Sequence, residues 1–538
     1  MKLERIMDES SAAALRVDWL IAELEPVSDY GRRIFARLEP FAPGEEAAAT
    51  SSAAEIAEFA SAVGSAHIDA MRDALRGVPD ATSAIARAGM GDALSDLNFL
   101  EIQRFCDVLE RIEPLLAGQS VYALPRCTAV AKVLEPGRSG KFGFYLEDRF
   151  DDALADSRAH VRDAQTAFDT ARGRLGTALE QAVGRQAGDS GEFIVMRDEL
   201  KGNLPSGLRV VREAPTYYLC ELELDEAALA ALRLRDDRLA ALAEREEATR
   251  AALSAVIARH SVELQTAAHQ LGVLDVLAAA ARFCLRHNCV PASYARTPTV
   301  DFEDAYFLPL QSDLNRQDRA YTPITVSLSE ATILTGPNMG GKSVALQTCG
   351  FIAACASFGI PVPAKSATVA LFAQMVWLGI NSNDDGAGTL LSSFAREIVR
   401  LRDALAAAAE PPLFLVDELA RTTTPDEGRA LLLALMARLR DRRICAFVAT
   451  HLSGIARDAS APHYAVRGLR GAPHEAPSEN LQEALAALAR LMDYTIEPVT
   501  DDRAGSADAL FLAGMLGLDR NFIQTAWQML AKSEVEKP

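Results

Sequence analysis

The feature that most constrains this chain is a glycine-rich turn set between two apolar stretches. Residues 335–343 read Thr-Gly-Pro-Asn-Met-Gly-Gly-Lys-Ser, after the run ATIL and before the pattern VALQTCGFIAACA. The spacing G-x-x-x-x-G-K-S between a strand and a helix is typical of a phosphate-binding loop, or P-loop. The surrounding region is therefore predicted to be an α/β nucleotide-binding domain.

Each residue type in this loop suits a triphosphate. Glycines let the backbone curl so that its N–H groups face phosphate oxygens, and the N-terminus of the next helix favours an anion. We expect Lys342 to reach the β- and γ-phosphates and Ser343 to bind Mg²⁺. The predicted ligands are therefore ATP and Mg²⁺. The predicted nucleotide contacts in the loop are Gly336, Pro337, Asn338, Met339, Gly340, Gly341, Lys342 and Ser343.

A second motif places two acids after an apolar run. Leu413–Val416 is predicted to be a buried strand, followed by Asp417 and Glu418. Ligands of open α/β sheets sit at the carboxyl ends of the strands. We expect Asp417 to hold the Mg²⁺ shell and Glu418 to orient or deprotonate the attacking water. The alternative is an acidic pair that only caps a helix.

A third strand pattern, residues 445–450, ends before His451. His451 is predicted to contact the γ-phosphate or the attacking water, although a lone histidine at such a place is usually structural. The predicted catalytic set is Glu418, His451 and Lys342.

Composition limits the remaining possibilities. The 538 residues are enough for roughly two to four domains. The chain contains no charge-free apolar run of about 18 residues and no signal-peptide pattern at its N-terminus, so we expect no membrane span and a cytoplasmic protein. The eight cysteines form no C-x-x-C pair and are expected to be buried or incidental thiols in a reducing compartment. A net charge of −19 means that DNA binding would need a local basic surface or an enclosing geometry.

Pattern changes along the chain predict four regions. Two stretches rich in helix formers flank a short strand-rich insert at about 188–225, which favours a hairpin-like arm over an ordinary helical bundle. Before them, VYAL, TAVAKVL and FGFYLED in residues 119–150 are predicted to be strands. The regions are 1–150, mainly helical; 151–290, the long helices with their insert; 291–500, the α/β ATPase domain; and 501–538, a terminal helical pair.

The three motifs together carry a resemblance. TGPNMGGKS, LVDELARTTTPDEG and ATH resemble the MutS family of DNA mismatch repair ATPases, a branch of the ABC-type ATPases. The Pro-Asn-Met-Gly-Gly stretch makes the resemblance specific, because generic P-loops rarely contain it. The implied fold class is an α/β ABC-type P-loop ATPase domain plus a mainly α core and lever region with a small β insert.

The resemblance extends beyond these motifs. Tyr321 stands where the family places an aromatic residue that stacks on adenine. Residues 392–397 resemble the family's Ser-Thr-Phe-x-x-Glu signature, which implies that Ser392 and Ser393 reach the nucleotide of a dimer partner. A hydroxyl and a helix N-terminus aimed at a γ-phosphate explain such a contact. Without the other motifs, Ser392 and Ser393 would be interpreted as a plain helix cap.

The resemblance also implies roles for the regions, with some departures. Residues 1–150 would be the core domain, 151–290 the lever helices with a reduced clamp insert, and 501–538 a helix-turn-helix that supports dimerisation. The chain is expected to be a truncated form without the mismatch-recognition and connector domains, and without a nuclease domain after 530. Ala420 and Thr422 stand where the family usually has glycines, which leaves the dimer-loop geometry and the hydrolysis rate open.

Two functions follow as hypotheses. The first is an ATP-switched dimeric clamp that binds duplex or branched DNA in repair or recombination, as a homodimer or as a heterodimer with a paralogue. The second is an ATP-dependent remodelling or reactivating factor for a protein client such as a cobalamin-dependent aminomutase. The balanced charge of residues 191–214 and the acidic chain favour the second. A degenerate scaffold is a third alternative, but the intact motif residues argue against it.

Overall fold

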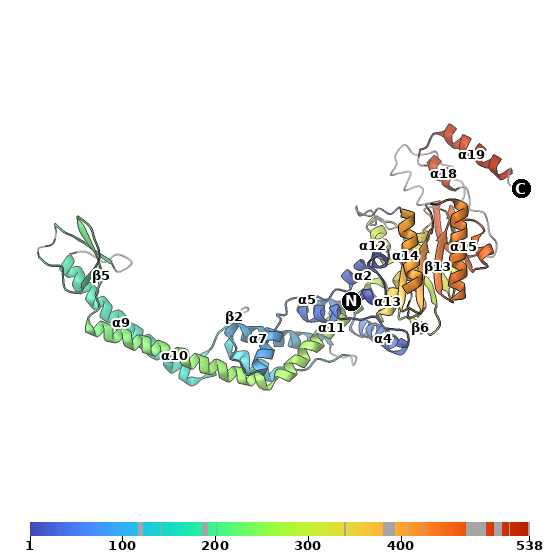
Figure 1. Cartoon of the computed structure of the whole chain (residues 1–538). Helices are drawn as coiled ribbons and strands as arrows, with labels where there is room; N and C mark the ends of the chain where they lie inside the picture. Colours follow the sequence, from blue (N-terminus) through green and yellow to red (C-terminus); the bar gives the residue numbers. More distant parts are fainter. Residues whose placement is uncertain are drawn as a thin grey trace. The chain divides into compact units, whose positions relative to one another are not determined.

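The computed structural model divides the chain into two compact units (Figure 1). The first comprises Met1–Gly77, Ile112–Ala123 and Gln270–Pro538, and the second comprises Val78–Arg111 and Leu124–His269. The residues that the structure describes are 1–116, 122–140, 143–184, 192–198, 200, 202–337, 341–379, 393–407, 409–421, 423–469, 491–499, 508–515 and 517–535.

The centre of the first unit is a six-stranded sheet in the order β11-β12-β13-β9-β14-β15. The pairs from β11 to β14 are parallel, and only β14 and β15 pair antiparallel. Strands buried on both faces read as continuous apolar runs, which is why the motif strands were visible in the sequence. The strands are β9 (Ala331–Thr335), β11 (Gln374–Leu378), β12 (Pro412–Asp417), β13 (Cys445–Thr450), β14 (His463–Leu469) and β15 (Met492–Pro498).

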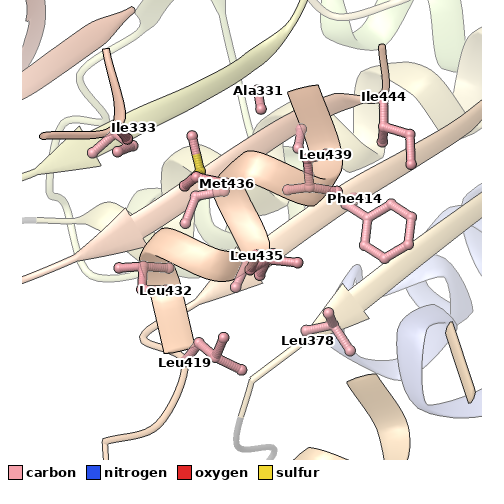
Figure 2. Packing of buried hydrophobic residues seen from close by; sticks show 14 of the residues in the cluster. Ala331, Ile333, Leu378, Phe414, Leu419, Leu432, Leu435, Met436, Leu439 and Ile444 are labelled. Atoms are coloured by element: carbon pink, nitrogen blue, oxygen red, sulfur yellow. The ribbon is translucent and has the colours of Figure 1, made fainter. Parts of the chain in front are cut away.

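One face of this sheet is covered by α15 (Pro425–Asp441), as Figure 2 shows. Its buried residues Leu432, Leu435, Met436 and Leu439 recur at helical spacing, so they form one stripe. The stripe packs in the same cluster as Phe414 of β12 and other sheet residues. Burial of this kind contributes roughly 1.5–3 kcal/mol for each large apolar side chain.

A second sheet of the first unit has the order β6-β10-β7-β8 and is mixed, with β6 and β10 parallel. Its strands are β6 (Ser293–Ala295), β7 (Val300–Ala305), β8 (Ile324–Leu328) and β10 (Ser366–Ala370). The helices of the unit are η1 (Leu3–Arg5), α1 (Glu9–Ala14), α2 (Val17–Glu23), α3 (Asp29–Ala36), α4 (Glu46–Val63), α5 (Ser65–Arg76), η2 (Glu113–Leu116), α12 (Leu308–Asn315), α13 (Lys342–Ser357), α14 (Ser393–Ala407), α16 (Ile455–Ala459), α18 (Asp508–Met515) and α19 (Arg520–Val535).

The N-terminal segment covers the edge strand β11 of the six-stranded sheet. The N–H of Met375 donates to the carbonyl of Ile6 at 2.6 Å, and the N–H of Trp377 donates to Ser11 Oγ at 2.9 Å. Uncovered edge strands are open to unwanted pairing, so this contact protects the sheet. Gln347 of α13 also donates to the carbonyl of Ala14 at 2.8 Å. The segment therefore fixes both an edge of the sheet and the helix that follows the P-loop.

Helix α11 (Ser261–His287) belongs to both units by sequence and is long and apolar enough, by length and composition, to cross a membrane. Two thirds of its most apolar window, 67%, is buried within the protein, as in a core helix. Its fully buried Asp275 accepts hydrogen bonds from the hydroxyl and the N–H of Ser28, at 2.6 and 2.7 Å. These bonds explain how a carboxylate is accommodated in an apolar helix.

The second unit is built on the paired helices α9 (Asp152–Val183) and α10 (Glu226–Arg259). Between them in sequence lies an antiparallel sheet, β3-β5-β4, at one end of the pair (Figure 1). Leu179 of α9 packs in one cluster with Phe193 and Cys220 of the sheet. The remaining elements are α6 (Thr82–Gly89), α7 (Asp96–Ile112), α8 (Thr128–Leu134), η3 (Glu135–Gly137), β1 (Arg138–Ser139), β2 (Gly143–Phe144), η4 (Asp148–Phe150), β3 (Glu192–Met196), β4 (Leu208–Glu213) and β5 (Tyr217–Leu222).

The two long helices and the strand-rich insert predicted between them are confirmed, but the strands predicted in residues 119–150 are largely wrong. TAVAKVL forms helix α8, because Val130 and Leu134, four residues apart, are both buried on one helical face. In the described part of FGFYLED, residues 143–148, only Gly143–Phe144 is a strand, and residues 122–124 of VYAL are irregular. All eight cysteines are buried free thiols, as predicted.

Two helical glycines predict opposite effects of substitution by alanine. A Cβ on Gly350 of α13 would lie 2.6 Å from Leu415 Cδ1, whereas a Cβ on Gly173 of α9 would have nothing within 4 Å. We expect Gly350→Ala to destabilise its unit by about 1–3 kcal/mol through overpacking. Gly173→Ala should stabilise by up to about 1 kcal/mol, because alanine is the better helix former. Unfolding midpoints from scanning calorimetry test both, and equal shifts for the two variants would contradict the packing around Gly350.

Candidate nucleotide-binding site

The candidate residues gather because three neighbouring parallel strands end at the same edge of the sheet. In the register, Thr335 of β9 lies opposite Thr450 of β13, and Asp417 of β12 lies opposite Ala449 of β13. The P-loop, the acidic pair and the segment beginning at His451 each follow directly from one of these strands. The carboxyl edge of the sheet is where ligands of open α/β sheets bind.

Two glycines at the ends of the P-loop are required by its geometry. A Cβ on Gly336 would lie 2.9 Å from Cβ of Val466, so a larger residue would displace β14. Gly341 precedes α13 with φ +88°, a left-handed conformation that glycine adopts without steric cost. The predicted contacts Asn338, Met339 and Gly340 lie outside the described residues.

Lys342 lies at the centre of the site. It is the first residue of α13 and is only 5% exposed. Its Nζ donates to the carbonyls of Gly336 and Pro337 at 3.0 and 3.1 Å and lies 3.3 Å from Oε1 of Glu418. The cation of Lys342 therefore lies beside Glu418, the first residue after β12.

The two acids have different surroundings. Burial raises the pKa of Asp417, and the hydrogen bond from the Ser343 hydroxyl opposes this only in part. Glu418 has φ +53°, its N–H donates to the carbonyl of Ala449 at 3.1 Å, and its Oε2 lies 3.7 Å from Nε of Arg421. The arrangement thus brings Lys342, Ser343, Asp417 and Glu418 together, as the sequence predicts.

The other predicted site residues lie around Lys342 and the acidic pair or are not among the described residues. His451 directly follows β13 with an exposed side chain. The ring of Tyr321 packs 5.6 Å from that of Tyr306, and its hydroxyl accepts from the Phe307 N–H at 3.1 Å. That hydroxyl also lies 3.4 Å from Thr348 Oγ1 of α13, and burial raises the pKa of Tyr321. Ser392 and the side chain of Ser393 are outside the described residues, although α14 begins at Ser393.

Sequence reasoning assigned no role to three further residues. Oε1 of Glu397 on α14 accepts from the N–H of Ala420 at 2.9 Å. A Cβ on Gly379 would lie 2.9 Å from Cβ of Asp417, so glycine allows β11 to end close to the acid. His463 Nε2 lies 2.7 Å from Thr335 Oγ1, at the start of the P-loop. Only Glu397 had a sequence signal, because it belongs to the signature-like run at 392–397.

The oxygen atoms of Ser343 and Asp417 suit Mg²⁺. Within the described ranges, no group of three or more His, Cys, Asp or Glu side chains could hold a metal. Mg²⁺ is usually bound through one or two carboxylates together with substrate phosphates, and it does not need a cage of protein ligands. A hydroxyl hydrogen-bonded to a partly buried carboxylate beside the P-loop therefore fits a magnesium ion that arrives with a nucleotide.

The raised pKa of Asp417 predicts that this acid lowers the stability of the protein at neutral pH. A carboxyl group with a raised folded-state pKa stabilises the fold only at low pH, and this contribution is lost as pH rises through that pKa. Asp417→Asn should therefore raise the unfolding midpoint at neutral pH, with a gain that shrinks as the pH falls.

Asp458 provides a control of opposite sign, because its hydrogen bond from Arg429 lowers its pKa. That contribution is present above the usual Asp pKa and is lost as pH falls through the lowered value, so Asp458→Asn should lower the midpoint at neutral pH. Thermal unfolding of both variants across the acid range measures these effects. A destabilising Asp417→Asn at neutral pH would contradict the burial of the acid.

The comparisons with known proteins agree with the motifs. The family model for MutS domain V matches residues 332–475. "Endonuclease MutS2" of Symbiobacterium thermophilum is 24% identical over 86% of this chain and 56% of its own length. "Endonuclease MutS2" of Geobacillus thermodenitrificans is 26% identical over 84% of this chain and 57% of its own length. The protein of the same name from Fusobacterium nucleatum is 27% identical over 49% of this chain and 32% of its own length.

The matches thus span between about a third and somewhat over half of the length of these relatives. The matched range, residues 332–475, contains both the P-loop and the acidic pair, so the family match and the site geometry concern the same residues. Residues 332–475 are therefore a MutS domain V, and the chain is similar to proteins of the MutS family over most of its length.

Proposed function

We propose that this protein binds ATP with Mg²⁺ at the carboxyl edge of the six-stranded sheet and hydrolyses it to ADP and phosphate. One observation carries the proposal. Lys342 of the P-loop lies 3.3 Å from Glu418, while Ser343, the next residue, hydrogen-bonds to Asp417. Lys342 and Ser343 thus each contact one acid of the adjacent pair Asp417 and Glu418. Together these side chains supply the phosphate-binding cation, the Mg²⁺ ligands and the water-orienting acid that phosphoryl transfer to water needs.

Each side chain has a separate task in this mechanism. Lys342 would bind the β- and γ-phosphate oxygens, and Glu418 would orient the attacking water and accept its proton. Ser343 and Asp417 would hold Mg²⁺, which when bound neutralises charge on the phosphate oxygens. His451 would contact the γ-phosphate or the water from the end of β13, and Tyr321 would stack on the adenine.

The second part of the proposal is a dimer that closes on ATP. Ser392 and Ser393 would lie at the partner's γ-phosphate, and the beginning of α14 at Ser393 supports this because a helix N-terminus attracts an anion. Two protomers would enclose two nucleotides, and hydrolysis would release them. In this proposal, residues 151–290 act as levers that transmit the closure, and residues 501–538 support dimerisation.

The third part concerns what the dimer holds. The names of the relatives, "Endonuclease MutS2", favour DNA as the ligand of an ATP-switched clamp acting in repair or recombination. One observation favours a protein client as the second candidate. Arg209 of β4 pairs with Glu221 of β5 at 2.7 Å, and Arg197, directly after β3, pairs with Glu213 of β4. Both arginines therefore already have an acidic partner within this insert. DNA binding needs lysine or arginine side chains that are free to neutralise phosphates and so displace the counterions of the DNA.

Blocking hydrolysis should stabilise the dimer. Glu418→Gln removes the proton acceptor and keeps the shape, so ATP with Mg²⁺ should bind but not turn over. We expect this variant to elute as a dimer with ATP and to dissociate without it, measured by size-exclusion chromatography with light scattering. Lys342→Ala is the control that should not respond to ATP. A monomer in every nucleotide state would exclude the cross-dimer mechanism, and lack of affinity for ATP with Mg²⁺ would exclude the whole proposal.

Salt dependence should distinguish the two ligands. If the clamp holds DNA, the affinity of the ATP-bound Glu418→Gln protein for duplex or branched DNA should fall steeply with salt. A slope of log affinity against log salt of about −3 or steeper corresponds to three or more phosphate contacts. Fluorescence anisotropy with labelled duplex, branched and mismatched DNA measures it, with Lys342→Ala as the control. Absence of binding at low salt would reject the DNA clamp in favour of a protein client.

A further inference from the structure

The loop that carries Glu418 has an unusual backbone. Both Glu418 and Ala420 have positive φ angles, +53° and +61°. Residues with a Cβ rarely adopt this left-handed conformation, and they keep it only where the surrounding structure enforces it. The direction of the Glu418 side chain therefore depends on the contacts that hold residues 418–421.

Among the residues that the structure describes, three hydrogen bonds hold this loop. The Glu418 N–H donates to Ala449 of β13 at 3.1 Å, and the Thr423 N–H donates to the carbonyl of Ala420 at 3.2 Å. The third is the bond from the Ala420 N–H to Oε1 of Glu397 at 2.9 Å. It differs from the other two bonds because its acceptor is a side chain on a separate helix, α14. Ala420 is itself only 4% exposed, so water is a poor replacement partner for its N–H.

We propose that Glu397 is a positioning residue for ATP hydrolysis. Its carboxylate holds the N–H of Ala420, and this fixes the left-handed turn two residues after Glu418. Glu418 is then kept directed toward Lys342, at 3.3 Å, and Arg421, at 3.7 Å. Glu397 acts through the loop and does not touch the nucleotide, and this inference rests on the proposed ATPase function.

The position of Glu397 on α14 links this helix to the loop that carries Glu418. Glu397 lies four residues, about one turn, after Ser393, where the helix begins. The helix whose N-terminus belongs to the signature-like run is thus bonded directly to the loop of the hydrolytic acid. A change in the position of α14 would therefore reach Glu418 through a single hydrogen bond.

The packing of α14 does not depend on Glu397. Phe394, Leu401 and Leu405 pack against the cluster formed by the sheet and α15. Arg400, one turn further along α14, also donates to Ser10 Oγ at 2.6 Å. Removing the carboxylate should therefore leave the helix in place and release only the loop, so a variant without it is expected to fold.

The test compares Glu397→Ala with Glu397→Gln in the full chain. Alanine removes the acceptor, whereas glutamine keeps an amide oxygen at the same place and removes the charge. We expect Glu397→Ala to lower kcat for ATP hydrolysis by about tenfold with KM nearly unchanged, because it disturbs the transition state and not the binding of ATP. Glu397→Gln should restore kcat to within about threefold of the original protein.

Arg402→Ala changes an exposed residue of the same helix, whose charge pairs only with the adjacent Asp403 among the described residues, and should leave kcat unchanged. A wild-type kcat in Glu397→Ala would overturn the inference, as would a glutamine variant as slow as the alanine variant. Loss of nucleotide binding together with a lowered unfolding midpoint in Glu397→Ala would assign the residue a structural role and overturn it as well. If the unaltered protein does not hydrolyse ATP, the failure belongs to the proposed function itself.

Discussion

The parallel pairing of β9, β13 and β12 is the constraint on which the candidate site depends. The P-loop and the acidic pair are about 80 residues apart in sequence, yet the register places Thr335, Thr450 and Asp417 at one edge of the sheet. A shift of one residue in this register would turn Asp417 toward the other face of the sheet. The buried apolar side chains of these strands, including Phe414 and Phe447, fix the register, so hydrophobic packing determines where the charges meet.

The N-terminal segment, residues 6–14, supports the elements around the site although it is far from them in sequence. Ile6 and Ser11 pair with β11, Ala14 accepts from α13, and Ser10 accepts from Arg400 of α14. One short stretch of chain therefore contacts the P-loop helix, the sheet edge and the signature-like helix. The same region is joined to α11 through Asp275, whose carboxylate holds the turn at Ser28. This places the elements around the site in one packed unit.

The site itself departs from the rules that the rest of the unit obeys. Asp417 carries a partly buried carboxyl group with a raised pKa, and Glu418 and Ala420 have left-handed backbones. Such features destabilise a fold and persist where the surroundings enforce them. Here the carbonyl of Ala449 and the carboxylate of Glu397 hold the left-handed backbone. Lys342 and Ser343 contact the side chains of the two acids. These features lower the stability of the fold at this edge, as is common at functional sites.

The sequence alone determined the local features. The P-loop, the strand before Asp417 and the long helices each depend on neighbouring residues, so periodicity and glycine spacing predict them. Only the tertiary structure decided which distant groups meet. TAVAKVL became a helix because burial of Val130 and Leu134 outweighed its strand-like composition, and the thiols of Cys106 and Cys127 share a hydrogen bond that no spacing indicates. The Glu397–Ala420 bond belongs to the same class. Contacts between residues far apart in sequence arise from packing in three dimensions, and a local pattern contains no record of them.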